Sequence, residues 1–136
     1  MRLAILAALS ACSLMPTGCS FGARIQCRAS EEPAVIDSLY FGTSRPNGTV
    51  TTEEWRQFLA QSITPRFPAG LTAWEAAGQW RNSAGEIQKE QSHVLHLVHP
   101  DTAENEQAVN DVIRAYKETF QQDAVLRVRS GTCISF

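Results

Sequence analysis

The sequence lacks the features that would indicate nucleic-acid binding or a body embedded in a membrane. Its 136 residues contain 12 Lys and Arg against 14 Asp and Glu, so no excess of positive charge is available for a polyanion. No apolar run approaches the roughly 20 residues that span a bilayer as a helix. With 43% hydrophobic and 19% charged residues, the composition is that of a folded chain. The length has room for one domain.

Recognisable catalytic and cofactor motifs are missing too. No serine stands in a Gly-x-Ser-x-Gly turn, and Gly42 and Gly48 are isolated turn residues rather than parts of a phosphate-binding loop. His93, His96 and His99 lie on a predicted strand, where residues three apart point to opposite faces and the outer two stand about 20 Å apart. All three cannot bind one metal ion. We therefore predict no catalytic residue, no cofactor and no metal site, and the balance favours a protein that is not an enzyme.

The N-terminus has the parts of a secretory leader. Arg2 supplies a positive charge, an apolar run follows over 3–9, and small residues come next. The run is too short to remain in a membrane as a spanning helix. We therefore predict a leader over 1–22 and an exported protein, located in the periplasm or on a membrane of the cell envelope.

Three routes out of this leader are open. The four residues that end at Cys12 resemble a bacterial lipobox, but they leave an unusually short leader. The four that end at Cys19 give a better length, with proline in place of the expected aliphatic residue. Ordinary cleavage after Gly22 would give a freely secreted protein. We favour lipidation, which would tether the protein to a membrane surface without spanning it.

The four cysteines predict a disulfide. If Cys19 is lipidated or removed with the leader, Cys27 and Cys133 remain as an even pair in an oxidising compartment. If Cys12 is the lipid site instead, Cys19 is left over. A bond between Cys27 and Cys133 would tie together the two ends of the mature chain.

The first half of the mature chain predicts a linker, a strand and a helix. Residues 23–34 are interpreted as a linker, and over 35–41 apolar residues alternate with a mixed set, which is the period of a strand. Thr51 and Glu54 have the spacing of a capping box at the start of a helix. Pro65 ends that helix, because the residue before a proline avoids the helical region.

The second half predicts two strands, a helix and a last strand. Strands over 71–80 and 87–99 flank a turn-rich loop around Gly85. A helix that opens at Pro100 carries one apolar stripe at helical spacing. The last strand begins at Val125 and continues to the C-terminus.

This order of elements, β-α-β-β-α-β, predicts an α+β fold of the ferredoxin-like type over 35–136. Its usual form is a four-stranded antiparallel sheet with both helices on one face. The first and last strands are then antiparallel neighbours. Cys27, before the first strand, would therefore lie near Cys133, at the end of the last.

Several short blocks follow one another through nearly all of the chain after the leader. They are Leu39-Tyr40-Phe41-Gly42, Thr64-Pro65-Arg66-Phe67-Pro68, Gly70-Leu71-Thr72, Gly78-Gln79-Trp80-Arg81, Ser92 with Val94-Leu95, and Val125-Leu126-Arg127-Val128 with Cys133 and Phe136. Together these blocks resemble the bacterial domain-of-unknown-function family numbered 3574. The resemblance implies a small exported, often lipoprotein-like protein with no established activity, and it supplies no catalytic residues.

The face of the sheet that the helices leave open is the main candidate surface. If the apolar neighbours of Tyr40, His96 and Arg127 face the helices, these three side chains meet on the open face from three different strands. Trp74 and Trp80 would join them from the second strand. Aromatic and guanidinium groups together suit an anionic or planar ligand, or the centre of a protein interface.

Arg66 and Arg81 form a second candidate set, because each lies in a loop marked by proline or glycine. They could bind a carboxylate or phosphate, or they could tie their loops by bonding to carbonyl groups.

The candidate surfaces and the missing catalytic motifs together favour a non-catalytic module that binds an envelope ligand or protein. The alternatives are a domain that associates with itself as a homodimer, and a small enzyme that uses His96 as acid or base.

Overall fold

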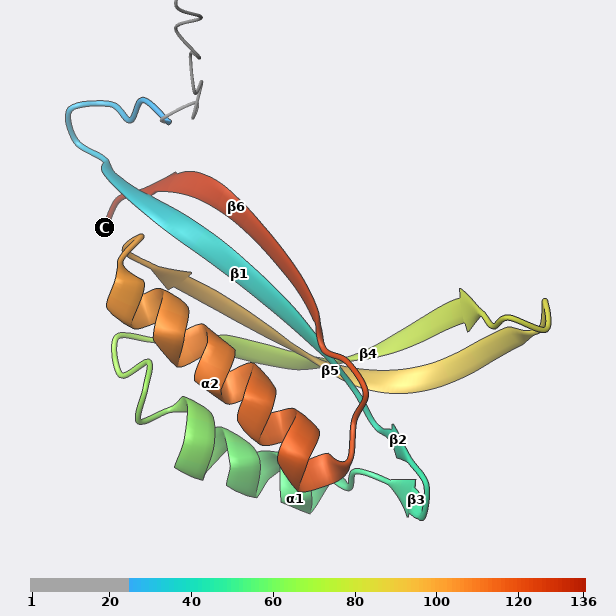
Figure 1. Ribbon diagram of the computed structural model, residues 1–136. Coiled ribbons are helices and arrows are strands. Elements are labelled where there is room, and N and C mark those ends of the chain that lie inside the picture. The colour runs from blue at the N-terminus through green and yellow to red at the C-terminus, as the bar shows by residue number, and fades with distance from the viewer. Residues whose placement is uncertain (1–24) are drawn as a thin grey trace, which may run out of the picture.

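The computed structural model describes residues 25–136, in which a four-stranded antiparallel sheet carries two helical segments on one face (Figure 1). The predicted leader, with Cys12 and Cys19, lies outside the described residues. No helix among the described residues is long and apolar enough to cross a membrane. The elements are β1 (Glu32–Gly42), β2 (Ser44–Arg45), β3 (Gly48–Thr49), α1 (Thr52–Phe58), η1 (Leu59–Ile63), β4 (Thr72–Arg81), β5 (Ile87–His99), α2 (Ala103–Phe120) and β6 (Leu126–Ile134).

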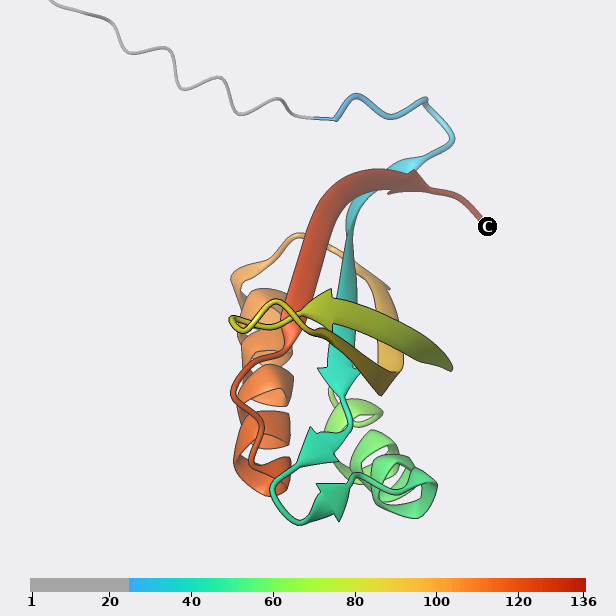
Figure 2. The ribbon, with the colours of Figure 1, turned by 90° about the vertical axis from the view of Figure 1, so that its right-hand side faces the viewer.

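The strand order confirms the predicted ferredoxin-like fold. The strands lie in the order β4-β5-β1-β6, and each neighbouring pair is antiparallel. The short strands β2 and β3 form a separate hairpin in the loop between β1 and α1. Figure 2 shows this hairpin beside the helices, at the end of the molecule remote from the C-terminus.

The register of the sheet separates its two faces by residue number. Leu39 pairs with Leu95 and with Arg127, whereas Tyr40 pairs with Val94 and with Leu126. Directly opposed residues of antiparallel strands point to the same side. Odd-numbered side chains of the four long strands therefore face the helices, and even-numbered side chains lie on what we call the open face.

The capping box at the start of α1 is confirmed. The Glu54 backbone N–H donates to Thr51 Oγ1 at 3.2 Å, and the Thr51 backbone N–H donates to Glu54 Oε2 at 2.8 Å. The helix does not end in regular α form, because its last turn widens into the π-helical segment η1. Thr64 caps that segment just before Pro65, as the proline predicted.

Aromatic rings fill the space between the sheet and the helices. The Tyr116 ring lies 4.6 Å from Phe41 and 4.7 Å from Phe120, and its hydroxyl donates to the Gly42 carbonyl oxygen at 2.9 Å. Burial raises the pKa of Tyr116 above its usual range. The buried core comprises Leu39, Phe41, Val50, Trp55, Phe58, Ile63, Phe67, Leu95, Leu97, Val109, Val112, Tyr116 and Phe120.

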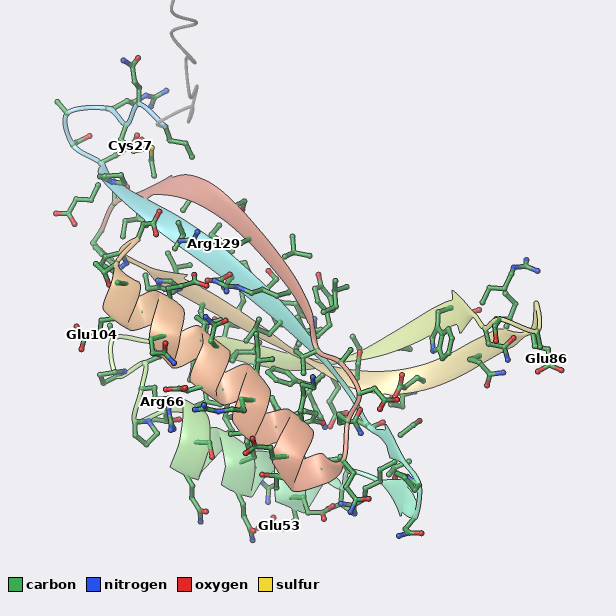
Figure 3. All side chains as sticks on the ribbon, in the orientation of Figure 1. Cys27, Glu53, Arg66, Glu86, Glu104 and Arg129 are labelled. Atoms are coloured by element: carbon green, nitrogen blue, oxygen red, sulfur yellow. A yellow bond between two sulfur atoms is a disulfide. The ribbon has the colours of Figure 1, made fainter. Side chains whose placement is uncertain are left out.

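The predicted disulfide is present. Cys27 and Cys133 are bonded, with their Cα atoms 5.6 Å apart. Cys27 lies just before β1, where Figure 3 labels it. Cys133 lies near the end of β6, where it pairs with Pro33 of β1. The bond closes the end of the sheet at which the first and last strands meet.

The first strand begins earlier than the sequence predicted. Glu32 pairs with Ile134 and Pro33 pairs with Cys133, so the end of the expected linker belongs to β1. The pairing of β1 with β5 extends only to Val35. At Pro33 the strand therefore has a neighbour on one side only, which is where a sheet tolerates proline.

Candidate functional site

The open face holds most of the side chains that the sequence placed there. Tyr40, His96, Trp74 and Trp80 all carry even numbers and lie on this face. His96 Nδ1 lies 3.2 Å from the Ser38 hydroxyl oxygen, and the His96 and Trp74 ring centres lie 6.3 Å apart. Trp80 lies farther along the β4–β5 hairpin.

Arg127 does not lie on the open face, so this part of the prediction was wrong. It is opposed to Leu39 in the register and points toward α2. Its apolar neighbours Leu126 and Val128 are on the open face, with 62% and 49% of their surfaces exposed. In β6, an edge strand, the apolar side chains Leu126 and Val128 thus lie on the open face, whereas the arginines lie on the helix side.

Arg127 is the centre of an ion network beneath the sheet. Its guanidinium donates to both oxygens of Asp37, at 2.6 and 2.9 Å, and to both oxygens of Glu106, at 2.6 and 2.7 Å. Asp37 is fully buried and also lies 3.0 Å from His99 Nε2. His99 Nδ1 lies 2.9 Å from the Pro100 carbonyl oxygen. Bidentate pairs of this kind satisfy most of the donors of a guanidinium, so the network holds β1, β6 and α2 together.

The loop arginines also make local contacts. Arg66 Nη1 donates to the Ser62 carbonyl oxygen at 2.5 Å, and Arg81 Nη1 donates to the Gly85 carbonyl oxygen at 3.0 Å. Each arginine thus ties its own loop, which is the second of the two interpretations of the sequence. The structure does not bring either of them together with Tyr40 and His96.

A pocket that the sequence did not reveal lies where β4 and β5 pass the start of α1. Its volume is about 430 Å³. The lining residues come from the loop that contains β3, from the start of α1 and from the two strands. They are Thr43, Thr49, Val50, Thr51, Thr52, Glu75, Gln91, Ser92 and His93.

His93 is the buried polar group of this pocket. The residue is 4% exposed, and its ring stacks parallel to Trp55 with the ring centres 4.4 Å apart. Burial lowers the pKa of His93 from its ordinary value, against an opposing effect of Glu75, and so favours the neutral ring. Its Nδ1 atom is buried, and among the described residues it has no hydrogen-bond partner. Such atoms are rare in folded proteins, because leaving one unpaired costs about 1–3 kcal/mol.

Glu75 gives the pocket its charge. It is the cross-strand neighbour of His93 in the β4–β5 pair. It is the one charged residue of the lining, and it takes part in none of the ion pairs of the described residues. A carboxylate without a neighbouring Lys or Arg favours cations and disfavours phosphates and carboxylates.

A family model described as "Protein of unknown function (DUF3574)" matches residues 37–136. The chain belongs to this family. The matched range includes the whole pocket and the whole Arg127 network, and it begins beyond Cys27. No curated protein matches the chain.

Solved structures of a phage SAM lyase have the same fold as this DUF3574 protein. The enzyme in complex with S-methyl-5'-thioadenosine is 14% identical, with a TM-score of 0.56 over 76% of this chain and 90% of that chain. The apo enzyme is also 14% identical, with a TM-score of 0.51 over 84% of this chain and 97% of that chain. At this identity the likeness establishes the fold alone.

The Arg127 network gives the DUF3574 protein an acid-sensitive contact. The hydrogen bonds from Arg127 lower the pKa of Glu106 from 4.5 to about 2. A lowered pKa means that the unfolded chain takes up protons first, so the contribution of Glu106 to stability is full above pH 4.5 and is lost as the pH falls toward 2. We expect Glu106→Gln to flatten the fall in the free energy of unfolding over this interval, measured by urea unfolding at a series of pH values.

The matched control for this measurement is Glu104→Gln. Glu104 lies on the same helix and outside the ion pairs of Arg127. It should keep the acid dependence of the unmodified protein. If Glu106→Gln also kept the full acid dependence, the assigned role of the Arg127–Glu106 pair would be wrong.

Proposed function

We propose that the protein is a ligand-binding module that takes a small, positively charged polar molecule into the pocket of His93 and Glu75. The observation that carries the proposal is the buried Nδ1 atom of His93, which has no partner among the described residues and belongs to a side chain that lines the pocket. A polar ligand can supply hydrogen-bonding partners to a pocket of this kind, and its cationic group can lie beside Glu75.

The size and lining of the pocket support this proposal. A volume of about 430 Å³ is within the range of small-molecule sites, which is roughly 300–1,000 Å³. Threonine hydroxyls and the Gln91 amide are neutral groups that can donate or accept hydrogen bonds. The His93 imidazole and the Glu75 carboxylate therefore lie among neutral groups that can orient a polar molecule without repelling a cation.

Binding without turnover fits the surroundings of His93. A nucleophile that a histidine activates is normally held by a hydrogen bond to that histidine, and a third group orients the ring. The face of His93 is packed against Trp55 instead, and Nδ1 has no orienting group among the described residues. We therefore assign His93 to binding.

Two compounds that differ in charge test the proposal. S-adenosylmethionine carries a sulfonium, an ammonium and a carboxylate group, so its net charge is positive, whereas S-methyl-5'-thioadenosine is neutral and lacks the amino-acid side chain. The fold shared with a phage SAM lyase whose structure holds the second compound motivates this choice of probes. We expect calorimetric titration to show tighter binding of the cation, and we expect NMR of the His93 ring to shift during the titration.

Paired substitutions place the binding in the pocket. His93→Phe keeps a ring on Trp55 and removes both nitrogens, so it should abolish binding, whereas His96→Phe makes the same change on the open face and should leave binding unaltered. Glu75→Gln should weaken binding of the cation a few-fold, which is the effect expected for an exposed ion pair. The affinities of the two compounds should therefore become more similar. The proposal fails if neither compound shifts the His93 resonances, or if His93→Phe and His96→Phe bind equally well.

A further inference from the structure

Charge is distributed very unevenly between the two faces of the sheet. On the open face the four long strands present no Lys, Arg or Asp, and their two charged residues are Glu32 and Glu90. Glu32 lies at the first position of β1, and Glu90 Oε1 accepts a hydrogen bond from the Ser44 backbone N–H at 2.9 Å. The other charged side chains of these strands all have odd numbers. They are Asp37, Glu75, Arg81, Lys89, Arg127 and Arg129.

Large apolar side chains occupy the open face in place of charges. One row across the sheet consists of Trp74, Val94, Tyr40 and Leu126, which oppose one another on β4, β5, β1 and β6. Val94 is buried beneath its neighbours, whereas the other three expose large parts of their surfaces. Sheets that face water usually present polar side chains, and extended apolar patches mark interaction surfaces.

The end of the β4–β5 hairpin extends this surface beyond the rest of the sheet. The pairing of β1 with β5 ends at Gly42 and Ser92, whereas β4 and β5 remain paired as far as Arg81 and Ile87. Figures 1 and 3 show the resulting two-stranded ribbon projecting past the helices, with Glu86 at its tip. Trp80 on this ribbon is 55% exposed. A two-stranded ribbon is marginally stable alone, so contact with a further surface would stabilise it.

The face is suited to a copy of itself. In a two-fold dimer the same patch meets itself, so any excess of one charge would be brought against the same charge. A patch without Lys or Arg, whose carboxylates lie at a strand end or in a local hydrogen bond, avoids that repulsion. A strongly acidic or basic partner would find no complementary charge there.

The area of the open face is close to what a dimer interface needs. Four strands about 4.8 Å apart and about 30 Å long cover on the order of 600 Å². A stable interface buries about 800 Å² on each partner, and the projecting ribbon supplies further surface. We propose that the open face is the interface at which two copies of this chain pack sheet against sheet.

Sedimentation velocity over a concentration series of the disulfide-bonded protein tests this proposal. We expect the unmodified protein to form a dimer. In Leu126→Lys the dissociation constant of that dimer should rise by a factor on the order of 100 or more, because each copy brings a new cation to the same interface. Leu126 is largely exposed in one copy, so the variant should keep the unfolding midpoint of the monomer fold. The matched control is Ala60→Lys, the same charge change on an exposed residue of η1, and it should dimerise as the unmodified protein does.

Quenching of tryptophan fluorescence provides a second measurement. Trp74 and Trp80 should become shielded from acrylamide as the dimer forms, whereas Trp55 is buried in every state. An unmodified protein that stays monomeric at all concentrations overturns the proposal, as would a different protein found on the same face. Equal dimerisation of Leu126→Lys and Ala60→Lys also overturns it. The pocket of His93 lies on the other side of the sheet, so these outcomes leave the ligand proposal standing.

Discussion

Replacing Cys27 and Cys133 together by serine should lower the free energy of unfolding by about 4–5 kcal/mol, the value expected from loop-closure entropy for a bond that joins residues 106 positions apart. Domains of this size are stabilised by about 5–15 kcal/mol in total, so the variant should lose a large fraction of its stability. Urea unfolding of the oxidised protein and of the double variant measures the difference.

Two comparisons control this experiment. The reduced unmodified protein should match the double variant, because both lack the covalent link. Thr132→Ser, a change beside the disulfide that leaves it intact, should have little effect. Equal stability of the oxidised protein and the double variant would mean that the bond contributes nothing beyond the pairing of β1 with β6.

Arg127→Met should also destabilise the fold strongly, by about 3–5 kcal/mol, because it leaves a buried carboxylate without its main partner. Asp37 has no exposed surface, and without Arg127 its remaining side-chain partner is His99. Removing the carboxylate as well, in Asp37→Leu with Arg127→Met, should recover part of the loss, since apolar side chains can replace a buried ion pair at little cost. A double-mutant cycle in urea measures the coupling.

Arg129→Met is the matched control for Arg127→Met. Arg129 lies two residues along the same strand, on the same face, and it pairs with Asp101 and, more distantly at 3.8 Å, with Glu106. All three side chains are more than a third exposed, so the loss should be about 0–1 kcal/mol. A similar loss in the two variants would show that burial of Asp37 is not what makes the Arg127 network important.

The order and type of the elements could be predicted because their signals are local. The capping box of Thr51 and Glu54, the stop at Pro65 and the alternation along β1 each lie within a few residues, and each was confirmed. The pairing of Cys27 with Cys133 followed from parity and from the neighbouring positions of the first and last strands. These features need no knowledge of how distant segments pack.

The face occupied by Arg127 could not be predicted in the same way. Alternation along β6 separates Leu126 and Val128 from Arg127, but it does not say which set faces the helices. The usual rule places the apolar set inside. In this strand Asp37 and Glu106 provide buried and half-buried partners for the arginine, and they lie 90 and 21 residues away in the sequence.

The pocket escaped prediction for a related reason. His93 and Glu75 meet only through the register of β4 with β5, which the sequence does not specify. The three histidines were tested from the sequence as one set of metal ligands, which strand geometry excluded, and each has a different environment in the structure. His93 stacks on Trp55, His96 contacts Ser38 and Trp74, and His99 joins Asp37. One feature of the sequence could have indicated the site. His93 stands at an inward position of a predicted strand, where a buried imidazole needs a hydrogen-bonding partner.

The disulfide also determines how mechanical load enters the molecule. A pull on the N-terminal side of Cys27 passes through the covalent bond into β6 as well as into β1, so it reaches both strands at the end where they are joined. Peeling β1 away from β6 would require the bond to break first. The hairpin tip around Glu86 lies at the far side of the molecule from Cys27 (Figure 3), so the ribbon bears none of this load directly.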